Sequence, residues 1–404
     1  MRRGDEQGAG GTRGAGARVR LGLERLATDE AARVRGRAVG LLAHPASVTA
    51  DLWHARDVLA GAGARVRALF GPEHGVGGEA QDMEGVADGG GPVRTHSLYG
   101  SEYASLSPRP EWLDGLDAVV IDLQDVGSRY YTFVWTALLM ARACAARGVE
   151  VLVCDRPNPL GGEVTEGAPQ RPGLRSFVGL EACPVRHGLT LGEVLAWRAR
   201  EESLASVAVI PMEGWSRAML WADTGLPWVL PSPNMPTPDT AAVYPGGCLL
   251  EGTSLSEGRG TTRPFEVFGA PWVDAAALAA AMASDGGAGQ VARAMSFRPM
   301  FQKHAGVTCA GVQVHVTDPR RFEPYRAYLA ALRACRRLPG FAWRTERYEF
   351  VDDVPAIDLL TGDGDVRAGL DAGAPVDDLL AVGAGRMAAW REGERARWLY
   401  PRAG

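Results

Sequence analysis

The chain has 404 residues, of which 46% are hydrophobic and 23% charged, which is the composition of a globular protein rather than a disordered or fibrous one. The formal net charge of -5 argues against a nucleic-acid partner, because phosphate binding needs a basic face. No run of about 18 apolar residues occurs, so we expect no membrane-spanning helix.

The first 20 residues are rich in Gly and Arg and lack the apolar segment of a secretory signal. We therefore expect residues 1–20 to form a disordered tail. The same observation predicts a cytoplasmic protein, with export only if the start codon is misassigned.

Five short apolar runs follow, and each has the length and composition of a buried strand. They lie at residues 38–43, 66–70, 118–123, 149–154 and 207–210. Segments with helical periodicity separate them, among them 55–61, 132–147 and 190–202. Such strands alternating with helices are typical of a parallel sheet covered on both faces. We therefore predict a Rossmann-like, doubly wound α/β domain over residues 21–285.

The character of the chain changes after residue 210. Residues 212–271 are rich in Pro, Gly, Trp and Ser, and a loop region of that length in a compact protein is usually functional. It is followed by a helix at 274–284, a Gly-rich break at 286–289, a strand at 308–316 and helices at 324–336 and 384–397. This order predicts a smaller α+β auxiliary domain over residues 286–404.

The third predicted strand ends in IDLQDVGSRYYT, a dense group of polar side chains. The carboxyl ends of parallel strands are where ligands bind in open α/β sheets. The candidate site residues in this motif are Asp122, Gln124, Asp125, Arg129 and Tyr130. The alternative is a surface turn whose carboxylates cap the next helix, but capping leaves the amide, the arginine and the tyrosine unexplained.

Two other strands also end in charged motifs. GPEHG follows the second strand and brings Glu73 and His74 to the same edge, where a buried Glu73 could act as a general acid. His74 could orient a group there or cap a turn. CDRPNP follows the fourth strand and carries Asp155 and Arg156, which either contact a ligand or pair with each other to hold the loop.

The long loop region contains two polar motifs, PSPNMPT with Asn234 and EGTSLSEGRGTTRPFE. In the second motif, the glycines on either side of Arg259 allow a left-handed backbone. Glu257, Arg259 and Arg263 could then converge on one ligand, and arginine suits a carboxylate or phosphate. In the alternative interpretation, Glu257 and Arg259 form only a solvated pair.

Motifs that define cofactor chemistry are missing. The sequence has no complete GxGxxG, no GxSxG, no HExxH and no histidines spaced as a metal cluster. Lys303 is the only lysine, which removes the P-loop, the protein-kinase site and most Schiff-base mechanisms. The six cysteines include no CxxC pair and are expected to be buried, reduced thiols. We expect neither a cofactor nor a metal.

The remaining inventory of Glu, Asp, Arg, Asn and Tyr suits a glycoside hydrolase, which needs a carboxylic acid to protonate the leaving oxygen and polar groups to hold sugar hydroxyls. It also suits a protein that binds a sugar without cleaving it. The residues alone separate these two functions poorly.

An ordered series of motifs resembles the NamZ-type exo-β-N-acetylmuramidases, a family formerly catalogued as a domain of unknown function. The resemblance runs from about Leu21 to the C-terminus and includes LFGPEHG, SLYG, DLQDVGSRYYT, DRPNP, RHGLTLGE, WVLPSPNMPT, YPGGCLLEGTSLSEGRGTTRPFE and GVQVHVTD. It implies a Rossmann-like domain and an auxiliary domain with the active cleft between them. It also implies hydrolysis of terminal, non-reducing β-1,4-linked N-acetylmuramic acid from peptidoglycan fragments, a bacterial cell-wall recycling reaction.

The resemblance also implies roles for individual residues. The family's proposed acidic residue in GPEHG corresponds to Glu73, which becomes the expected general acid. For the second role the candidates are Asp122, Asp125 and Glu257, or the acetamido group of the substrate itself. A cell-wall-sugar binding or sensing protein without turnover and a metal-dependent hydrolase are the competing expectations.

The lactyl group of muramic acid carries a carboxylate that N-acetylglucosamine lacks, so specificity for a muropeptide or an oligosaccharide containing this sugar needs a cation aimed at it. The candidate cations are Arg129, Arg259 and Arg263.

Overall fold

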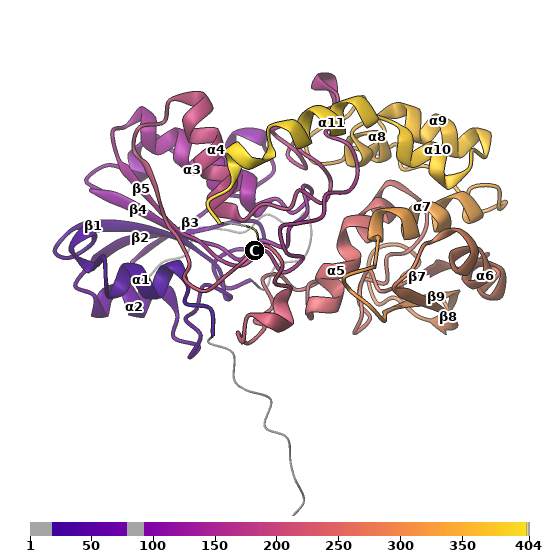
Figure 1. The fold of residues 1–404 in the computed structure, drawn as a ribbon, viewed down its shortest axis with the longest axis horizontal. Helices are drawn as coiled ribbons and strands as arrows, with labels where there is room; N and C mark the ends of the chain where they lie inside the picture. The colour runs from indigo at the N-terminus through magenta and orange to yellow at the C-terminus, as the bar shows by residue number, and fades with distance from the viewer. Residues whose placement is uncertain (1–17, 79–92, 401, 403–404) are drawn as a thin grey trace, which may run out of the picture.

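The computed structural model describes residues 18–78, 93–400 and 402. Figure 1 shows two lobes side by side, one built on a large sheet and the other on a small one. The expected tail lies mostly outside the described residues. Within it, however, Val19 is fully buried and Arg20 pairs with Asp29 at 2.7 Å, so these two residues belong to the folded part.

The first lobe contains a six-stranded parallel sheet in the order β3-β2-β1-β4-β5-β6. Its strands are β1 (Ala38–Ala43), β2 (Arg65–Gly71), β3 (Arg94–Ser97), β4 (Ala118–Asp122), β5 (Glu150–Cys154) and β6 (Val207–Ile210). The order reverses between β1 and β4, as in a doubly wound Rossmann sheet. The predicted fold class is therefore confirmed.

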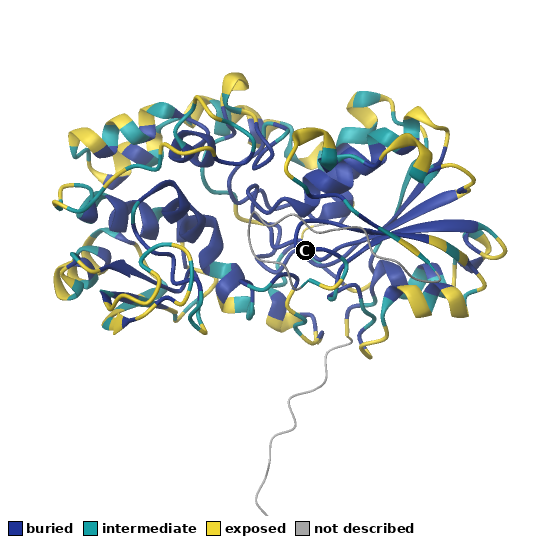
Figure 2. Cartoon of the chain, turned by 180° about the vertical axis from the view of Figure 1, so that it is seen from behind, coloured by how far each residue is buried: buried dark blue, intermediate teal, exposed yellow. Residues whose placement is uncertain are grey.

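Helices cover both faces of this sheet. They are α1 (Gly22–Ala27), α2 (Ala55–Gly61), α3 (Phe133–Ala146) and α4 (Leu191–Glu202). Successive residues of a strand point to opposite faces, so Val120 packs in the core with α1 and α2, whereas Ile121 packs in the core with α3 and α4. Figure 2 shows the buried residues gathered along these strands and the exposed residues on the outer helices.

All five predicted strands of the large sheet are present. The sixth strand, β3, was missed because its residues, RTHS, contain no apolar run. It lies at the edge of the sheet, beside β2 alone, where a strand needs fewer buried side chains.

The second lobe is built on a three-stranded antiparallel sheet in the order β7-β9-β8. Its elements are α5 (Pro238–Gly247), β7 (Val267–Ala270), α6 (Ala275–Asp285), β8 (Gln290–Phe297), β9 (Cys309–Val316) and α7 (Pro324–Cys335). Four short helices follow, α8 (Ala356–Thr361), α9 (Gly364–Ala372), α10 (Val376–Ala381) and α11 (Ala384–Glu392). A lobe of helices on a small antiparallel sheet agrees with the predicted α+β class.

The division between the lobes lies earlier than residue 286. β7 precedes that residue and pairs with β9, and α5 packs against α7. A division at residue 286 would separate β7 from its own sheet, so we place the start of the second lobe at α5.

The chain returns to the first lobe at its end, because the hydroxyl of Tyr400 donates to Oδ2 of Asp155 across 2.6 Å. All six cysteines are buried and free, as expected. In the part of the chain that the structure describes, no helix is long and apolar enough to cross a membrane.

Candidate active site

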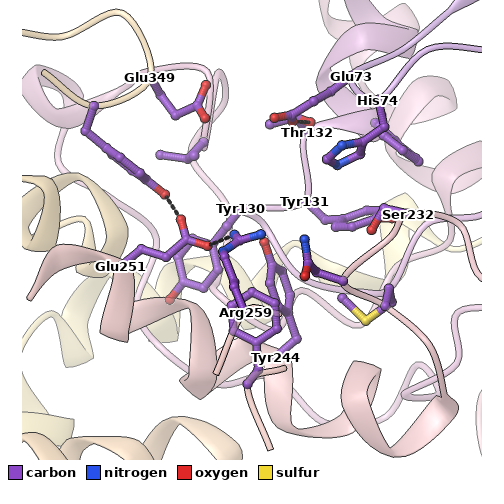
Figure 3. A pocket seen from close by; sticks show the side chains of 16 residues that line it. Glu73, His74, Tyr130, Tyr131, Thr132, Ser232, Tyr244, Glu251, Arg259 and Glu349 are labelled. Carbon is purple, nitrogen blue, oxygen red and sulfur yellow. Dashed lines mark hydrogen bonds and ion pairs between the residues drawn. The ribbon is translucent and has the colours of Figure 1, made fainter. Parts of the chain in front are cut away.

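A pocket lies between the two lobes, beyond the carboxyl ends of β2 and β4 (Figure 3). Its lining residues are Glu73, His74, Tyr130, Tyr131, Thr132, Phe133, Val178, Ser232, Asn234, Met235, Tyr244, Glu251, Arg259, Phe265, Tyr348 and Glu349. The pocket contains about 460 Å³ of empty space, part of it open to solvent.

Glu73 stands on the loop directly after β2. The turn there requires Gly71, because a Cβ at this position would lie 2.5 Å from the backbone nitrogen of Val76. Glu73 is only 5% exposed, and its Oε2 accepts a hydrogen bond of 2.7 Å from the hydroxyl of Thr132. Thr132 precedes α3, so the loops after β2 and β4 meet at this carboxylate.

His74 forms the wall next to Glu73. Its backbone is left-handed, with φ of 73°, which is uncommon outside glycine. Its ring lies 6.4 Å from the ring of Phe133, centroid to centroid, in an edge-on arrangement. Figure 3 shows the side chains of His74 and Glu73 next to each other on the first-lobe side of the pocket.

Arg259 and Glu251 form an ion pair on the opposite side of the pocket (Figure 3). Nη2 of Arg259 lies 2.6 Å from Oε1 of Glu251, and the hydroxyl of Tyr348 donates to Oε2 of the same carboxylate across 2.7 Å. The guanidinium also stacks over the ring of Phe265, at 5.2 Å from its centroid. Arg259 is therefore oriented by Glu251 and Phe265, and Glu251 is in turn fixed by Tyr348.

The two glycines around Arg259 are left-handed, as predicted. Gly258 has φ of 74° and Gly260 has φ of 78°. A Cβ on Gly258 would lie 2.1 Å from the carbonyl oxygen of Val267. Only glycine therefore fits here, and the tight loop directs Arg259 toward the pocket.

Glu257 contacts Arg259 but does not itself line the pocket. It accepts from Nε of Arg259 at 3.1 Å and pairs with Nζ of Lys303 at 2.8 Å. Burial alone would raise the pKa of Glu257, but Lys303 and Arg259 outweigh burial and hold the pKa below its usual value. Glu257 is therefore an ionised partner of Arg259.

Glu349 adds a third carboxylate to the pocket, after Glu73 and Glu251. Its backbone has φ of 45°, and the next residue, Phe350, has φ of 69°. Left-handed conformations in non-glycine residues cost about 1–3 kcal/mol each and concentrate at functional sites. Figure 3 shows the carboxylates of Glu349 and Glu73 on opposite sides of the upper part of the pocket.

The structure brings five of the predicted site residues into this pocket. They are Glu73, His74, Tyr130, Asn234 and Arg259. The other eight do not line it.

Asp122 and Arg156 form a buried ion pair with each other. Nε of Arg156 lies 2.6 Å from Oδ1 of Asp122, and Nη2 lies 2.7 Å from Oδ2. The same guanidinium donates to the backbone oxygen of Val48. Asp122 is fully buried, so this pair joins the loops after β1, β4 and β5 and offers no carboxylate to the pocket.

Asp125 and Gln124 also stabilise the loop after β4. Oδ2 of Asp125 accepts from the backbone nitrogen of Gly127 at 2.8 Å and lies 3.5 Å from Nε2 of His187. The side-chain nitrogen Nε2 of Gln124 donates to the backbone oxygens of Asp125 and Pro157. Neither side chain lines the interlobe pocket.

Asp155 does not pair with Arg156. It accepts from the hydroxyls of Thr190 and Tyr400, at 2.7 and 2.6 Å, and from the backbone nitrogen of Gly192 at 2.8 Å. Burial raises the pKa of Asp155, although these donors oppose the rise. The carboxylate anchors the start of α4 and the end of the chain.

Two of the three candidate cations are directed elsewhere. Arg129 is fully buried, and its guanidinium donates to the backbone oxygens of Cys183 and Leu360. Arg263 is 42% exposed and lies near Glu266, 3.5 Å away. Only Arg259 of the three lines the pocket.

Sequence reasoning missed several pocket residues, among them Ser232, Tyr244, Glu251, Tyr348 and Glu349. Glu251 stands in the motif that contains Arg259, and the charge pattern there could have revealed it. Glu349 lies in RYEFVDD, which shows no pattern that marks a site. Within the described residues, no group of three His, Cys, Asp or Glu side chains is arranged to hold a metal ion.

These observations define a two-lobed α/β protein with a Rossmann-like sheet and a polar interlobe pocket that contains three glutamates. Residues 39–239 match the family model described as Exo-beta-N-acetylmuramidase NamZ, N-terminal, and residues 242–400 match its C-terminal counterpart. The chain belongs to the exo-β-N-acetylmuramidase NamZ family, which confirms the resemblance. The two models divide the chain near residue 240, close to the start of α5.

A curated relative and two solved structures are similar over nearly the whole chain. The Bacillus subtilis (strain 168) protein named Peptidoglycan beta-N-acetylmuramidase NamZ is 39% identical over 368 residues, which are 90% of this chain and 87% of the relative. A DUF1343 family protein from Bacteroides fragilis NCTC 9343 is 30% identical, with a TM-score of 0.83 over 95% of this chain and 99% of its own. A second one is 26% identical, with a TM-score of 0.73 over 96% and 100%.

Proposed function

We propose that this chain is an exo-β-N-acetylmuramidase that releases terminal, non-reducing N-acetylmuramic acid from peptidoglycan fragments, with Glu73 as the general acid. The family and the name of the Bacillus subtilis relative support the reaction. The observation that carries the proposal is the pocket itself, which places a buried glutamate opposite an arginine held by a second glutamate.

Glu73 suits the role of proton donor by its position. Thr132 fixes one carboxyl oxygen, so the group has a defined orientation toward the pocket. As the bond between C1 and the glycosidic oxygen breaks, the proton of Glu73 passes to that oxygen and the next sugar leaves as an alcohol. Positive charge then develops at C1 and the ring oxygen.

Arg259 suits the recognition of the lactyl carboxylate. An arginine offers paired donors to a carboxylate, and an orientation fixed before binding reduces the cost of ordering. Arg259 lines the pocket from the second lobe, whereas Glu73 lines it from the first. The substrate would therefore be held between the proton donor and the cation.

The second catalytic carboxylate in this proposal is Glu349 rather than Asp122, Asp125 or Glu257. None of those three lines the pocket. Glu251 serves in this proposal as the carboxylate that orients Arg259. Proton NMR of the first-formed anomer shows the stereochemical course of the reaction: an α anomer would show inversion by water, and a β anomer would show retention.

The experiment is incubation of the purified full chain with the disaccharide N-acetylmuramyl-β-1,4-N-acetylglucosamine, followed by mass spectrometry. We expect both free monosaccharides to appear, at the same rate with and without a chelator. Binding of the disaccharide without release would overturn the enzyme and favour a sugar-binding protein. Activity lost to a chelator and restored by a divalent ion would instead indicate a metal-dependent hydrolase.

A further inference from the structure

Lys303 is the only lysine in a chain with 43 basic residues, and its surroundings explain why an arginine does not replace it. Its Nζ donates to the backbone oxygens of Leu250 and Thr253, at 2.9 and 3.0 Å, and pairs with Glu257 at 2.8 Å. Three acceptors around one nitrogen match the three hydrogens of an ammonium group. A planar guanidinium does not direct three hydrogens from one atom.

The loop that carries Lys303 is held in an unfavourable conformation. Gln302 has φ of 59° and His304 has φ of 57°, so left-handed residues flank the lysine on both sides. Nε2 of His304 lies 2.8 Å from the backbone oxygen of Ser254, which fixes the loop against the second lobe. Such strain persists only where surrounding contacts maintain it. The fold therefore maintains this position of the lysine.

Lys303 ends a chain of alternating charges that begins in the pocket. Glu251 pairs with Arg259 at 2.6 Å, Arg259 with Glu257 at 3.1 Å, and Glu257 with Lys303 at 2.8 Å. Both glutamates and the arginine are almost fully buried, so their charges are only weakly screened by solvent. Lys303 therefore contributes one positive charge next to the glutamate that Arg259 also contacts.

Lys303 itself does not line the pocket of Glu73. It lines a second pocket with Glu257, His304 and Trp343, which adjoins the first because Glu251 lines both, and its side chain is 25% exposed. A substrate in the first pocket therefore contacts Arg259 but not Lys303. Any effect of Lys303 on binding acts through the network.

We propose that Lys303 is a positioning residue that makes the pocket select a carboxylate-bearing sugar. Removal of its charge would leave Glu257 without one of its two cations and make the potential at Arg259 more negative, which opposes binding of the lactyl carboxylate. With Lys303 in place, Glu257 is shared between two cations, and the potential at Arg259 is more favourable for an anion. This inference rests on the proposed function, because it takes N-acetylmuramic acid as the ligand of Arg259.

The test is calorimetric binding of free N-acetylmuramic acid and of its methyl ester, which lacks the negative charge. In the wild-type chain the acid should bind more tightly than the ester. Lys303→Met should reduce this preference by about tenfold, which corresponds to about 1.4 kcal/mol. The matched control is Arg326→Met, which removes a cation of the same 25% exposure from a surface pair with Asp377 and should leave the preference unchanged.

Lys303→Arg separates charge from local packing. It keeps the positive charge but not the hydrogen bonds to the two backbone oxygens, so it should lower the midpoint of thermal unfolding while retaining the preference for the acid. Reductive methylation of the wild-type chain also keeps the charge, and it modifies only Lys303 and the N-terminal amine. Methylated Lys303→Met protein controls for the terminal amine.

The outcomes separate this inference from the proposed function. An unchanged preference in folded Lys303→Met protein, or its loss in Lys303→Arg protein, would overturn the charge role of Lys303 and leave the hydrolase in place. Failure of the wild-type chain to bind N-acetylmuramic acid would overturn the proposed substrate and the role of Lys303 with it.

Discussion

The hydroxyl of Thr132 donates a hydrogen bond to Oε2 of Glu73 across 2.7 Å, and both residues line the interlobe pocket. Glu73 follows β2, whereas Thr132 lies 59 residues later, at the start of α3. The bond fixes the carboxyl group of the proposed acid relative to the main helix of the first lobe. A general acid must be within reach of the oxygen that it protonates, so this orientation bears directly on catalysis.

Thr132→Val should lower kcat by about tenfold, because a side chain of the same shape no longer orients the carboxyl group of Glu73. The measurement is kcat on the disaccharide, together with the midpoint of thermal unfolding. Thr240→Val is the matched control, since Thr240 also donates to a glutamate, Glu266, but outside the pocket. Equal kcat values for the two variants would contradict an orienting role of Thr132.

Tyr348→Phe should raise KM severalfold and change kcat little. The variant removes the hydroxyl that fixes Glu251, and Arg259 then loses part of its orientation. Tyr400→Phe provides the comparison, because it also removes a buried hydroxyl bonded to a carboxylate, that of Asp155. Each variant should lose about 1–2 kcal/mol of unfolding free energy. A rise of KM in both variants would mean that a general loss of stability, and not a changed orientation of Arg259, raises KM.

Asp122→Asn distinguishes the structural role of Asp122 from the catalytic role expected from sequence. It breaks a buried ion pair with Arg156, so the free energy of unfolding should fall by about 3–5 kcal/mol. The kcat of the protein that remains folded should stay close to the wild-type value. A stable variant with abolished turnover would restore Asp122 as a catalytic candidate. Denaturant titration and active-site-normalised rates provide both quantities.

The pKa of Glu257 predicts a pH dependence of stability. Lys303 and Arg259 hold this pKa below its usual value of 4.5, so the ionised group stabilises the folded state above that pH. The stabilisation should disappear as the pH falls through the lowered pKa. The difference in unfolding free energy between wild type and Glu257→Gln should thus be constant from pH 6 to 8 and shrink below 4.5. A difference that does not change down to pH 3 would contradict the pairing.

The strands of the large sheet could be predicted because burial on both faces leaves continuous apolar runs, such as AVGLLA in β1. β3 has no such run, and β7 lies in a segment whose glycines and prolines resemble a loop. The partner of β7 is β9, which follows 39 residues after β7 ends, and that pairing is what moved the boundary of the second lobe. Local patterns do not contain such long-range pairings.

Only part of the site could be predicted from the sequence, and the reason is related. Position at a strand end correctly brought Glu73 to the pocket, but it could not distinguish a side chain that faces the pocket from one that ties loops together. Asp122 and Arg129 have the composition expected of a site, yet both are fully buried and bonded within the protein. The position of Glu349 in the pocket depends on a strained turn of the second lobe, and no sequence pattern predicts that turn.

The most direct test of the central claim compares Glu73→Gln with the wild type on two substrates. On the disaccharide, whose leaving group needs a proton, kcat should fall by about 1,000-fold. On an aryl glycoside of N-acetylmuramic acid with an acidic phenol, which leaves without protonation, the loss should be far smaller. Glu163→Gln, at an exposed position outside the pocket, should match the wild type on both. Wild-type turnover of the disaccharide by Glu73→Gln would contradict the assignment of Glu73 as the acid.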